Sequence, residues 1–196
     1  MVTKRKINFT ECIEGIDCCI KNAKRLAEEA NIIGNKSPTS TFLLIIAFEE
    51  LGKAHLLGQT ASIISKGKSV NWKKFWGMFT SHKFKQTGLF EMILVGQKLL
   101  LDHYQEIKRT DPNLGKIIKS KNCVHKNIVY LHRLIEKIKS GDYEIIKWKN
   151  LYVDHPNNKW FVPKRAKVVG FIDSRNIYTY ITDLETMKKS LLKKFK

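Results

Sequence analysis

Two adjacent carboxylates and a lysine stand at the end of the most apolar stretch of the chain. Glu49 and Glu50 directly follow the run Phe42–Phe48, and Lys53 comes one helical turn later. Residues three and four apart share one face of a helix, so Lys53 can pair with either carboxylate. Buried carboxylates are costly unless they are paired or hydrogen-bonded. Two interpretations stay open: an ordinary Glu–Lys pair where the helix reaches solvent, or a polar cluster with a function.

A second group combines lysines with aromatic residues. No acidic residue occurs between Lys66 and Glu91, a stretch that also carries several tryptophans and phenylalanines. Lysines neutralise phosphates and aromatic rings stack on bases, so this stretch is a plausible nucleic-acid surface. Phe75, Trp76 and Phe79 are also spaced as one helical face, which favours packing of these rings in a core. The lysines remain available to a polyanion in either case.

The net charge is strongly positive. The chain has 36 lysine and arginine residues against 18 aspartate and glutamate residues, a formal charge of +18. Such a charge attracts polyanions, namely RNA, DNA, anionic lipid or an acidic protein. Lysine supplies 30 of the 36 cations, and a lysine-rich composition by itself produces the same excess. Charge alone therefore does not choose the partner.

The four cysteines show neither a disulfide framework nor the spacing of a metal site. We expect reduced thiols in or near a core, and neither a metal nor another cofactor. The basic N-terminus has no long apolar region behind it, so no signal peptide is expected. Thr39–Phe48, the longest uncharged apolar run, is too short to span a bilayer. These features predict a cytoplasmic protein without a membrane partner.

Hydrophobic spacing predicts an all-α fold of four to five main helices. The expected ranges are about Thr10–Ile33, Ser37–Lys66, Ser81–Arg109, Asn122–Lys139 and Ser174–Lys194. Ser37 and Pro38 mark the start of the second helix as N-cap and first residue, and Gly67 marks its end. A short turn joins the first two helices, so we expect an antiparallel hairpin with the second helix at the centre.

We expect the whole chain, residues 1–196, to form a single domain. Residues 1–9 form a basic arm, and residues 174–196 carry the C-terminal helix. Between the predicted fourth and last helices, residues 143–173 are rich in aromatic residues, prolines and asparagines. That composition indicates an irregular segment or a small hairpin.

Four segments of the sequence together resemble one protein family. They read KNAKRLAEEA in the first helix, AFEELGKAHLL in the second, then WKKFWGMFTSHKFK and LYVDHPNNKWFVP. Their order and separation, over roughly residues 13–190, resemble the AbiV family of bacterial abortive-infection proteins within the HEPN superfamily. The resemblance implies an HEPN-like helical bundle, a homodimer, and antiphage defence through arrest of translation. It also implies activation by a phage-encoded protein.

Many HEPN domains are metal-independent ribonucleases that use an arginine and a histidine four to six residues apart. Here none of the six arginines precedes a histidine at that distance. Lysines do, but the chain has so many that such pairs arise by chance, and lysine lacks the planar fork that grips a phosphate. The alternative is a non-catalytic basic protein that blocks the translation machinery, such as the ribosome, or another target without cutting RNA.

Metal-free RNA cleavage needs a base, an acid and a cation near the phosphate. The first candidate is His82, because a histidine titrates near neutral pH and this one lies in the SHKFK segment. A histidine at a helix start can also simply bond nearby backbone. The further catalytic candidates are Glu50, Lys53 and His125. The candidate RNA-binding residues are Lys73, Lys74, Lys83, Lys85, Lys121 and Lys126. The Glu49, Glu50 and Lys53 group could instead order the central helix or a dimer interface.

Overall fold

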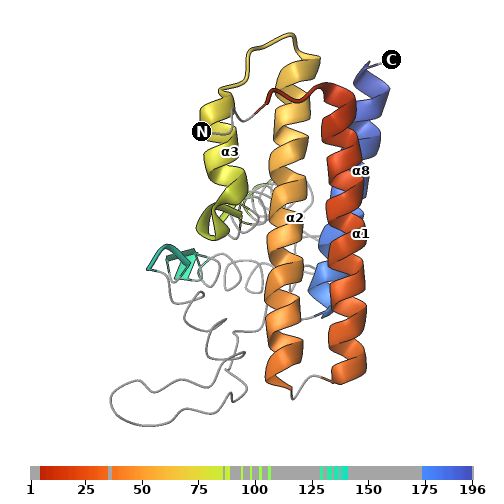
Figure 1. Cartoon of the computed structure of the whole chain (residues 1–196), viewed down its shortest axis with the longest axis vertical. Coiled ribbons are helices and arrows are strands. Elements are labelled where there is room, and N and C mark those ends of the chain that lie inside the picture. The colour runs from red at the N-terminus through yellow and green to blue at the C-terminus, as the bar shows by residue number, and fades with distance from the viewer. Residues whose placement is uncertain are drawn as a thin grey trace.

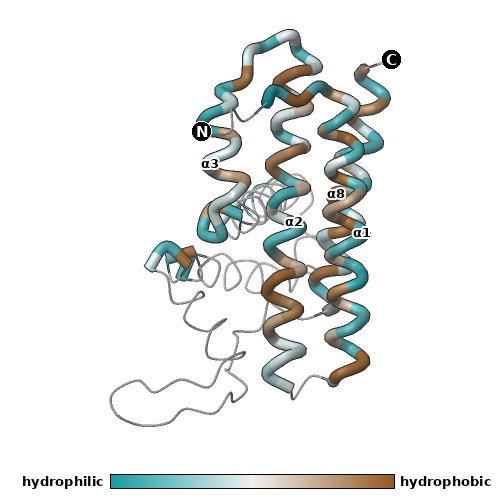
Figure 2. The backbone as a smooth tube through the Cα atoms, in the orientation of Figure 1, coloured by the Kyte–Doolittle hydropathy of each residue, from teal (hydrophilic) through white to brown (hydrophobic). Residues whose placement is uncertain are grey.

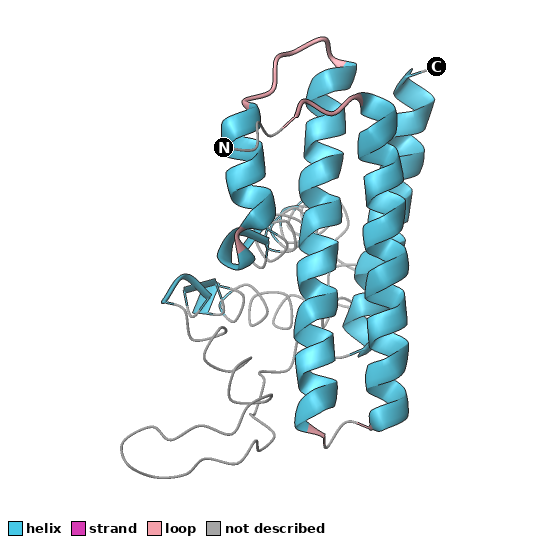
Figure 3. Cartoon of the chain, viewed as in Figure 1, coloured by secondary structure: helices cyan, strands magenta, loops and turns pink. Residues whose placement is uncertain are grey.

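A computed structural model describes the part of the chain that carries most of these candidates. The described residues are 5–34, 37–85, 87–88, 94, 98, 102, 106, 129, 132–133, 135–136, 138–140 and 174–195. Every regular element among them is an α-helix, as Figure 3 shows, which confirms the all-α prediction. The predicted irregular segment 143–173 lies outside the described residues, as do most residues of the two helices predicted before it.

The first helix, α1, spans Phe9–Ile33. Asn8 is its N-cap, so the helix begins one residue before the start at Thr10 that the sequence predicts. The Asn8 side chain accepts a hydrogen bond from the backbone N–H of Glu11 at 2.9 Å, and the Glu11 carboxylate accepts one from the backbone N–H of Asn8 at 2.8 Å. This reciprocal pair is a capping box, which satisfies two backbone donors at once and so fixes the helix start.

The second helix, α2, spans Pro38–Ser65 and begins as predicted, with Ser37 as N-cap and Pro38 as its first residue. It ends just before Gly67, whose φ of 66° suits a residue without a side chain. Figure 2 shows the apolar run as the most hydrophobic part of the helix. Buried residues occur along most of its length, so α2 is the central helix that the sequence predicts.

The last described helix, α8, spans Ser174–Phe195 and packs against both α1 and α2 (Figure 1). The rings of Phe9 and Phe195 stack with centroids 3.8 Å apart, which joins the start of α1 to the end of α8. An ion pair of 2.5 Å links Lys188 of α8 to Asp17 of α1. The three long helices α1, α2 and α8 thus enclose the main hydrophobic core.

A short helix, α3, spans Trp72–Thr80 and lies beside α2 on the side away from α1 (Figure 1). Phe75 is buried, and Trp76 and Phe79 pack partly buried against the core, which confirms that these rings form a packing face. The Trp76 indole N–H donates a hydrogen bond to the backbone carbonyl of Arg5 at 2.9 Å. The chain at Arg5, just before α1, is therefore held against α3.

Candidate functional site

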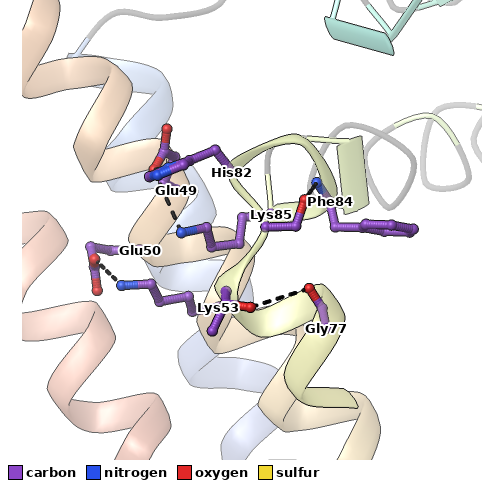
Figure 4. A network of polar contacts seen from close by, with 9 residues as sticks. Glu49, Glu50, Lys53, Gly77, His82, Phe84 and Lys85 are labelled. Carbon is purple, nitrogen blue, oxygen red and sulfur yellow. Dashed lines mark hydrogen bonds and ion pairs between the residues drawn. The ribbon is translucent and has the colours of Figure 1, made fainter. Parts of the chain in front are cut away.

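A buried polar contact joins α2 to the helical turn that follows α3. The Glu49 side chain is 3% exposed, and its Oε2 atom accepts a hydrogen bond from Nδ1 of His82 at 2.5 Å. The ammonium group of Lys85 lies 3.7 Å from the same oxygen atom. Figure 4 shows both side chains pointing at Glu49. Glu49 is therefore buried, and it is not part of a Glu–Lys pair that faces solvent.

Local structure explains how His82 reaches α2. Ser81 has an extended backbone conformation that ends α3, and its hydroxyl accepts a hydrogen bond from the backbone N–H of Phe84 at 3.4 Å. Ser81 thereby starts a new helical turn as its N-cap, close to the start of the helix expected over Ser81–Arg109. His82 and Lys85 are three residues apart in that turn, so both side chains lie on the face that meets Glu49.

Gly52 lets this turn approach α2 closely. A Cβ atom at position 52 would lie 2.0 Å from the backbone oxygen of Lys85, a distance that no side chain can occupy. Gly52 lies three residues after Glu49, on the same side of α2. The EELGKA block thus supplies the carboxylate that His82 contacts and the gap that admits the Lys85 backbone.

Glu50 and Lys53 form a separate pair. Their charged atoms are 2.5 Å apart, and both side chains are mostly buried. The Lys53 ammonium lies 5.9 Å from the centre of the Phe79 ring on α3. Burial, together with the nearby Glu50 carboxylate, raises the pKa of the Cys19 thiol on α1 to about 12. The pair therefore lies where α1, α2 and α3 meet.

The contact with Glu49 gives His82 the arrangement of a general acid–base histidine. A carboxylate accepts only, so the bond keeps a proton on Nδ1 and leaves proton exchange with a substrate to Nε2. The His82 side chain is 50% exposed, so a substrate can reach the ring. A carboxylate behind the imidazole fixes its orientation and compensates the charge when the ring takes a proton.

The candidate RNA-binding lysines fall into three groups. Lys73 and Lys74 are exposed on α3, and Lys83 is exposed next to His82. Lys85 is 6% exposed and faces Glu49, so its charge serves the buried contact and not an outer surface. The remaining candidates, Lys121, Lys126 and the histidine His125, lie outside the described residues.

Two positions of this site escaped the sequence-based site prediction. The sequence places Glu49 in the charged group but gives no sign that a histidine contacts it, and it suggests no role for Gly52. A glycine in the middle of a helix costs about 1 kcal/mol relative to alanine. That cost is a signal of close packing, and it is the feature of the sequence that could have pointed to Gly52.

The described residues offer no cluster of three or more histidine, cysteine or acidic side chains that could hold a metal ion. Of the described cysteines, Cys12 and Cys19 are buried and Cys18 is exposed, and all three are free thiols. Burial raises the pKa of Cys12 to about 11. None of the helices in the described part of the chain has the length and apolarity needed to cross a membrane.

Comparison with known proteins gave one family. The model of the HEPN_AbiV family, described as AbiV, matches residues 11–178, which is most of the chain. The match includes all of α1 except its first two residues, all of α2 and α3, and the first turn of α8. It therefore contains the whole contact between Glu49, His82 and Lys85. No curated protein and no solved structure matches the sequence.

Proposed function

The chain belongs to the AbiV family of HEPN-like proteins, a family of abortive-infection defence. From that premise we propose that the protein arrests translation in phage-infected bacteria by cleaving RNA, with His82 as the catalytic residue. The single observation that supports a catalytic role is the bond between Nδ1 of His82 and the buried carboxylate of Glu49. A half-exposed histidine oriented from behind by a carboxylate is a recurrent device of general acid–base catalysis.

In the proposed reaction, Nε2 of His82 takes the proton of a ribose 2′-hydroxyl. The 2′-oxygen attacks the adjacent phosphorus, the bond from phosphorus to the 5′-oxygen breaks, and a 2′,3′-cyclic phosphate forms. The leaving 5′-oxygen takes a proton from water. Lys83 is exposed beside His82, and its charge stabilises the negative charge that develops on the phosphate oxygens.

The sites first predicted from the sequence take different places in this proposal. His82 is the catalytic residue and Glu49 positions it. Glu50 and Lys53 order the junction of three helices and do not touch the substrate. Lys73, Lys74 and Lys83 hold the RNA backbone, since they are exposed on α3 and on the turn that carries His82.

We also propose that the protein acts as a homodimer and that a phage-encoded protein switches it on. Both proposals come from the family. The charge of +18 supports association with an acidic protein or with RNA and the ribosome, because a field of this size draws polyanions to the surface.

A second candidate function is a binder that stops translation without cutting RNA. Two observations favour it: the high positive charge, and the absence of an arginine four to six residues before any histidine. The two candidates differ in their dependence on one residue. A binder loses activity gradually as lysines are removed, whereas a nuclease loses it with a single proton-transfer group.

Incorporation of a labelled amino acid in infected cells tests the proposal. Cells carrying the wild-type protein should stop protein synthesis after infection, and cells carrying His82→Asn should continue. Asparagine can place its amide nitrogen near the position of Nδ1 and keep a bond to Glu49, but it cannot exchange a proton at neutral pH. Continued arrest by a stably folded His82→Asn protein would favour the binder.

A further inference from the structure

A pocket of about 640 Å³ lies against the turn that carries His82. Residues of α2, the end of α3 and the turn after Ser81 all contribute to its walls. Its size is typical of sites that take a small molecule or one unit of a polymer. Phe84, which lines it, points away from the Glu49 contact in Figure 4. The turn therefore presents His82 to Glu49 and Phe84 to the pocket.

The pocket offers an apolar surface suited to a flat ligand. Leu56 and Met78 line it from α2 and α3, and Phe84, which also lines it, is 57% exposed. An apolar ring that is exposed to water is unfavourable, and a planar ligand stacked on Phe84 would remove the face of the ring from water. Nucleobases stack on aromatic side chains whatever their sequence, because each base has a π-face.

The remaining lining residues favour a ligand with negative charge. Lys83 and Lys139 are the exposed lysines of the lining, and no acidic residue occurs among the described residues that line the pocket. Outside the lining, the Glu136 carboxylate lies 3.5 Å from the Lys139 ammonium, so a phosphate at Lys139 would replace that contact. Gln59 adds an exposed amide, which can donate to and accept from the edge of a base. The lining thus combines a stacking ring, cations for a phosphate and one group for polar contacts.

We propose that this pocket holds one nucleobase, stacked on Phe84, with its phosphate at Lys83 and Lys139. That the base belongs to an RNA strand rests on the proposed function. Lys83 directly follows His82 in the chain, so a phosphate at Lys83 lies close to the histidine. The pocket would then position the strand for cleavage. Because a paired base cannot enter, it would also select single-stranded RNA over a duplex.

Equilibrium binding to the full-length His82→Asn protein tests this proposal without RNA being cut. Fluorescence anisotropy would measure the affinity for a labelled single-stranded RNA oligonucleotide, and titration calorimetry the affinity for a nucleoside monophosphate. The pocket variant is Phe84→Ala. Its control is Tyr178→Ala, which removes another exposed aromatic ring, on α8. A second variant, Leu56→Trp, fills the pocket and keeps the Phe84 ring.

Phe84→Ala and Leu56→Trp should each lower the affinity of the protein for single-stranded RNA by on the order of ten-fold. Tyr178→Ala should leave the affinity unchanged, and a duplex of the same sequence should bind less tightly and respond to none of the variants. If the variants lower the affinity for the nucleoside monophosphate but not the affinity for RNA, the pocket holds a free nucleotide. If the variants lower neither affinity, the pocket is not a nucleobase site.

These outcomes are independent of catalysis. A protein that cuts no RNA in cells can still bind a base here, and a nuclease acting through His82 can do so with this pocket empty. Failure of the pocket proposal therefore leaves the proposed function standing, and the reverse also holds.

Discussion

The α carbon of Gly52 faces the backbone oxygen of Lys85 so closely that an added Cβ atom would lie 2.0 Å from it. The contact holds the turn after Ser81 against α2 and so sets the position of His82 opposite Glu49. Backbone, unlike the tip of a flexible side chain, cannot move aside cheaply. Position 52 therefore controls the geometry of the whole site.

Gly52→Ala should lower the free energy of unfolding by about 1–3 kcal/mol, as overpacking of an interior does. It should also move His82 away from Glu49, which the NMR chemical shifts of the imidazole would report. The matched control is Gly77→Ala in α3, where nothing lies within 4 Å of the added Cβ atom. That change should raise stability by about 0.5–1 kcal/mol, since alanine is the better helix former. Equal stability of the two variants would contradict the close contact at Lys85.

Loss of the Glu49 carboxylate should lower the rate of RNA cleavage more than loss of the Glu50 carboxylate. Glu49→Gln removes a buried charge that faces both Lys85 and His82, and should cost on the order of 3 kcal/mol in the free energy of unfolding. It should also lower the rate of RNA cleavage by about 10²–10⁴-fold, because the amide no longer fixes the charge and tautomer of the histidine.

Glu50→Gln is the control for that experiment, since it alters the neighbouring carboxylate of the same helix. It should leave the cleavage rate and its pH profile unchanged. Urea unfolding and a single-turnover cleavage assay would compare the two variants. A loss of cleavage in Glu50→Gln with normal cleavage in Glu49→Gln would reverse the assignment.

The helices could be predicted from the sequence because local signals define them. Ser37 with Pro38 starts α2 and Gly67 lies just past its end. The packing of Phe75, Trp76 and Phe79 follows from their spacing in the same way.

The partner of His82 could not be predicted, because Glu49 is 33 residues away and their contact depends on how the turn docks on α2. The same docking separates Lys83, which stays exposed, from Lys85, which is buried. Two lysines two residues apart look equivalent in the sequence. On a helical turn, however, they point in different directions, and the docking of the turn on α2 at Gly52 and Glu49 sets which one faces inward.

The free energy of unfolding should decrease as the pH falls, because His55 takes up a proton more readily in the unfolded chain. Burial lowers the pKa of this histidine below its ordinary value of 6.5, and its Nδ1 atom has no hydrogen-bond partner among the described residues. The unfolded chain takes up a proton first as the pH falls through 6.5, which favours unfolding. Stability is thus full above that pH and declines below it, by at most about 1.4 kcal/mol per pH unit.

Urea unfolding between pH 7.5 and 5.5 measures that dependence. His55→Gln should flatten it, whereas His132→Gln, which alters an exposed histidine, should leave it as in the wild type. The comparison uses the slope and not the absolute stability, so a general loss of stability in either variant does not affect it. An unchanged slope in His55→Gln would contradict a partly buried ring that stays neutral in the folded protein.

RNA affinity should depend on the lysines beside His82. The triple change of Lys73, Lys74 and Lys83 to glutamine should weaken single-stranded RNA binding. It should also reduce the slope of the logarithm of affinity against the logarithm of salt concentration by about 2, since each phosphate contact contributes about 0.7. The control changes Lys189, Lys193 and Lys194, which are exposed on α8, and removes the same charge. Equal losses in the two triple variants would mean that only net charge attracts the RNA.

The most direct test of the central claim is an RNA integrity profile of phage-infected cells that carry the wild-type protein, His82→Asn or His132→Asn. The account predicts discrete cleavage of transfer, ribosomal or messenger RNA in cells with the wild-type and His132→Asn proteins, and intact RNA in cells with a folded His82→Asn protein. Intact RNA in every case while translation stops, or cleavage that persists in His82→Asn, would contradict it.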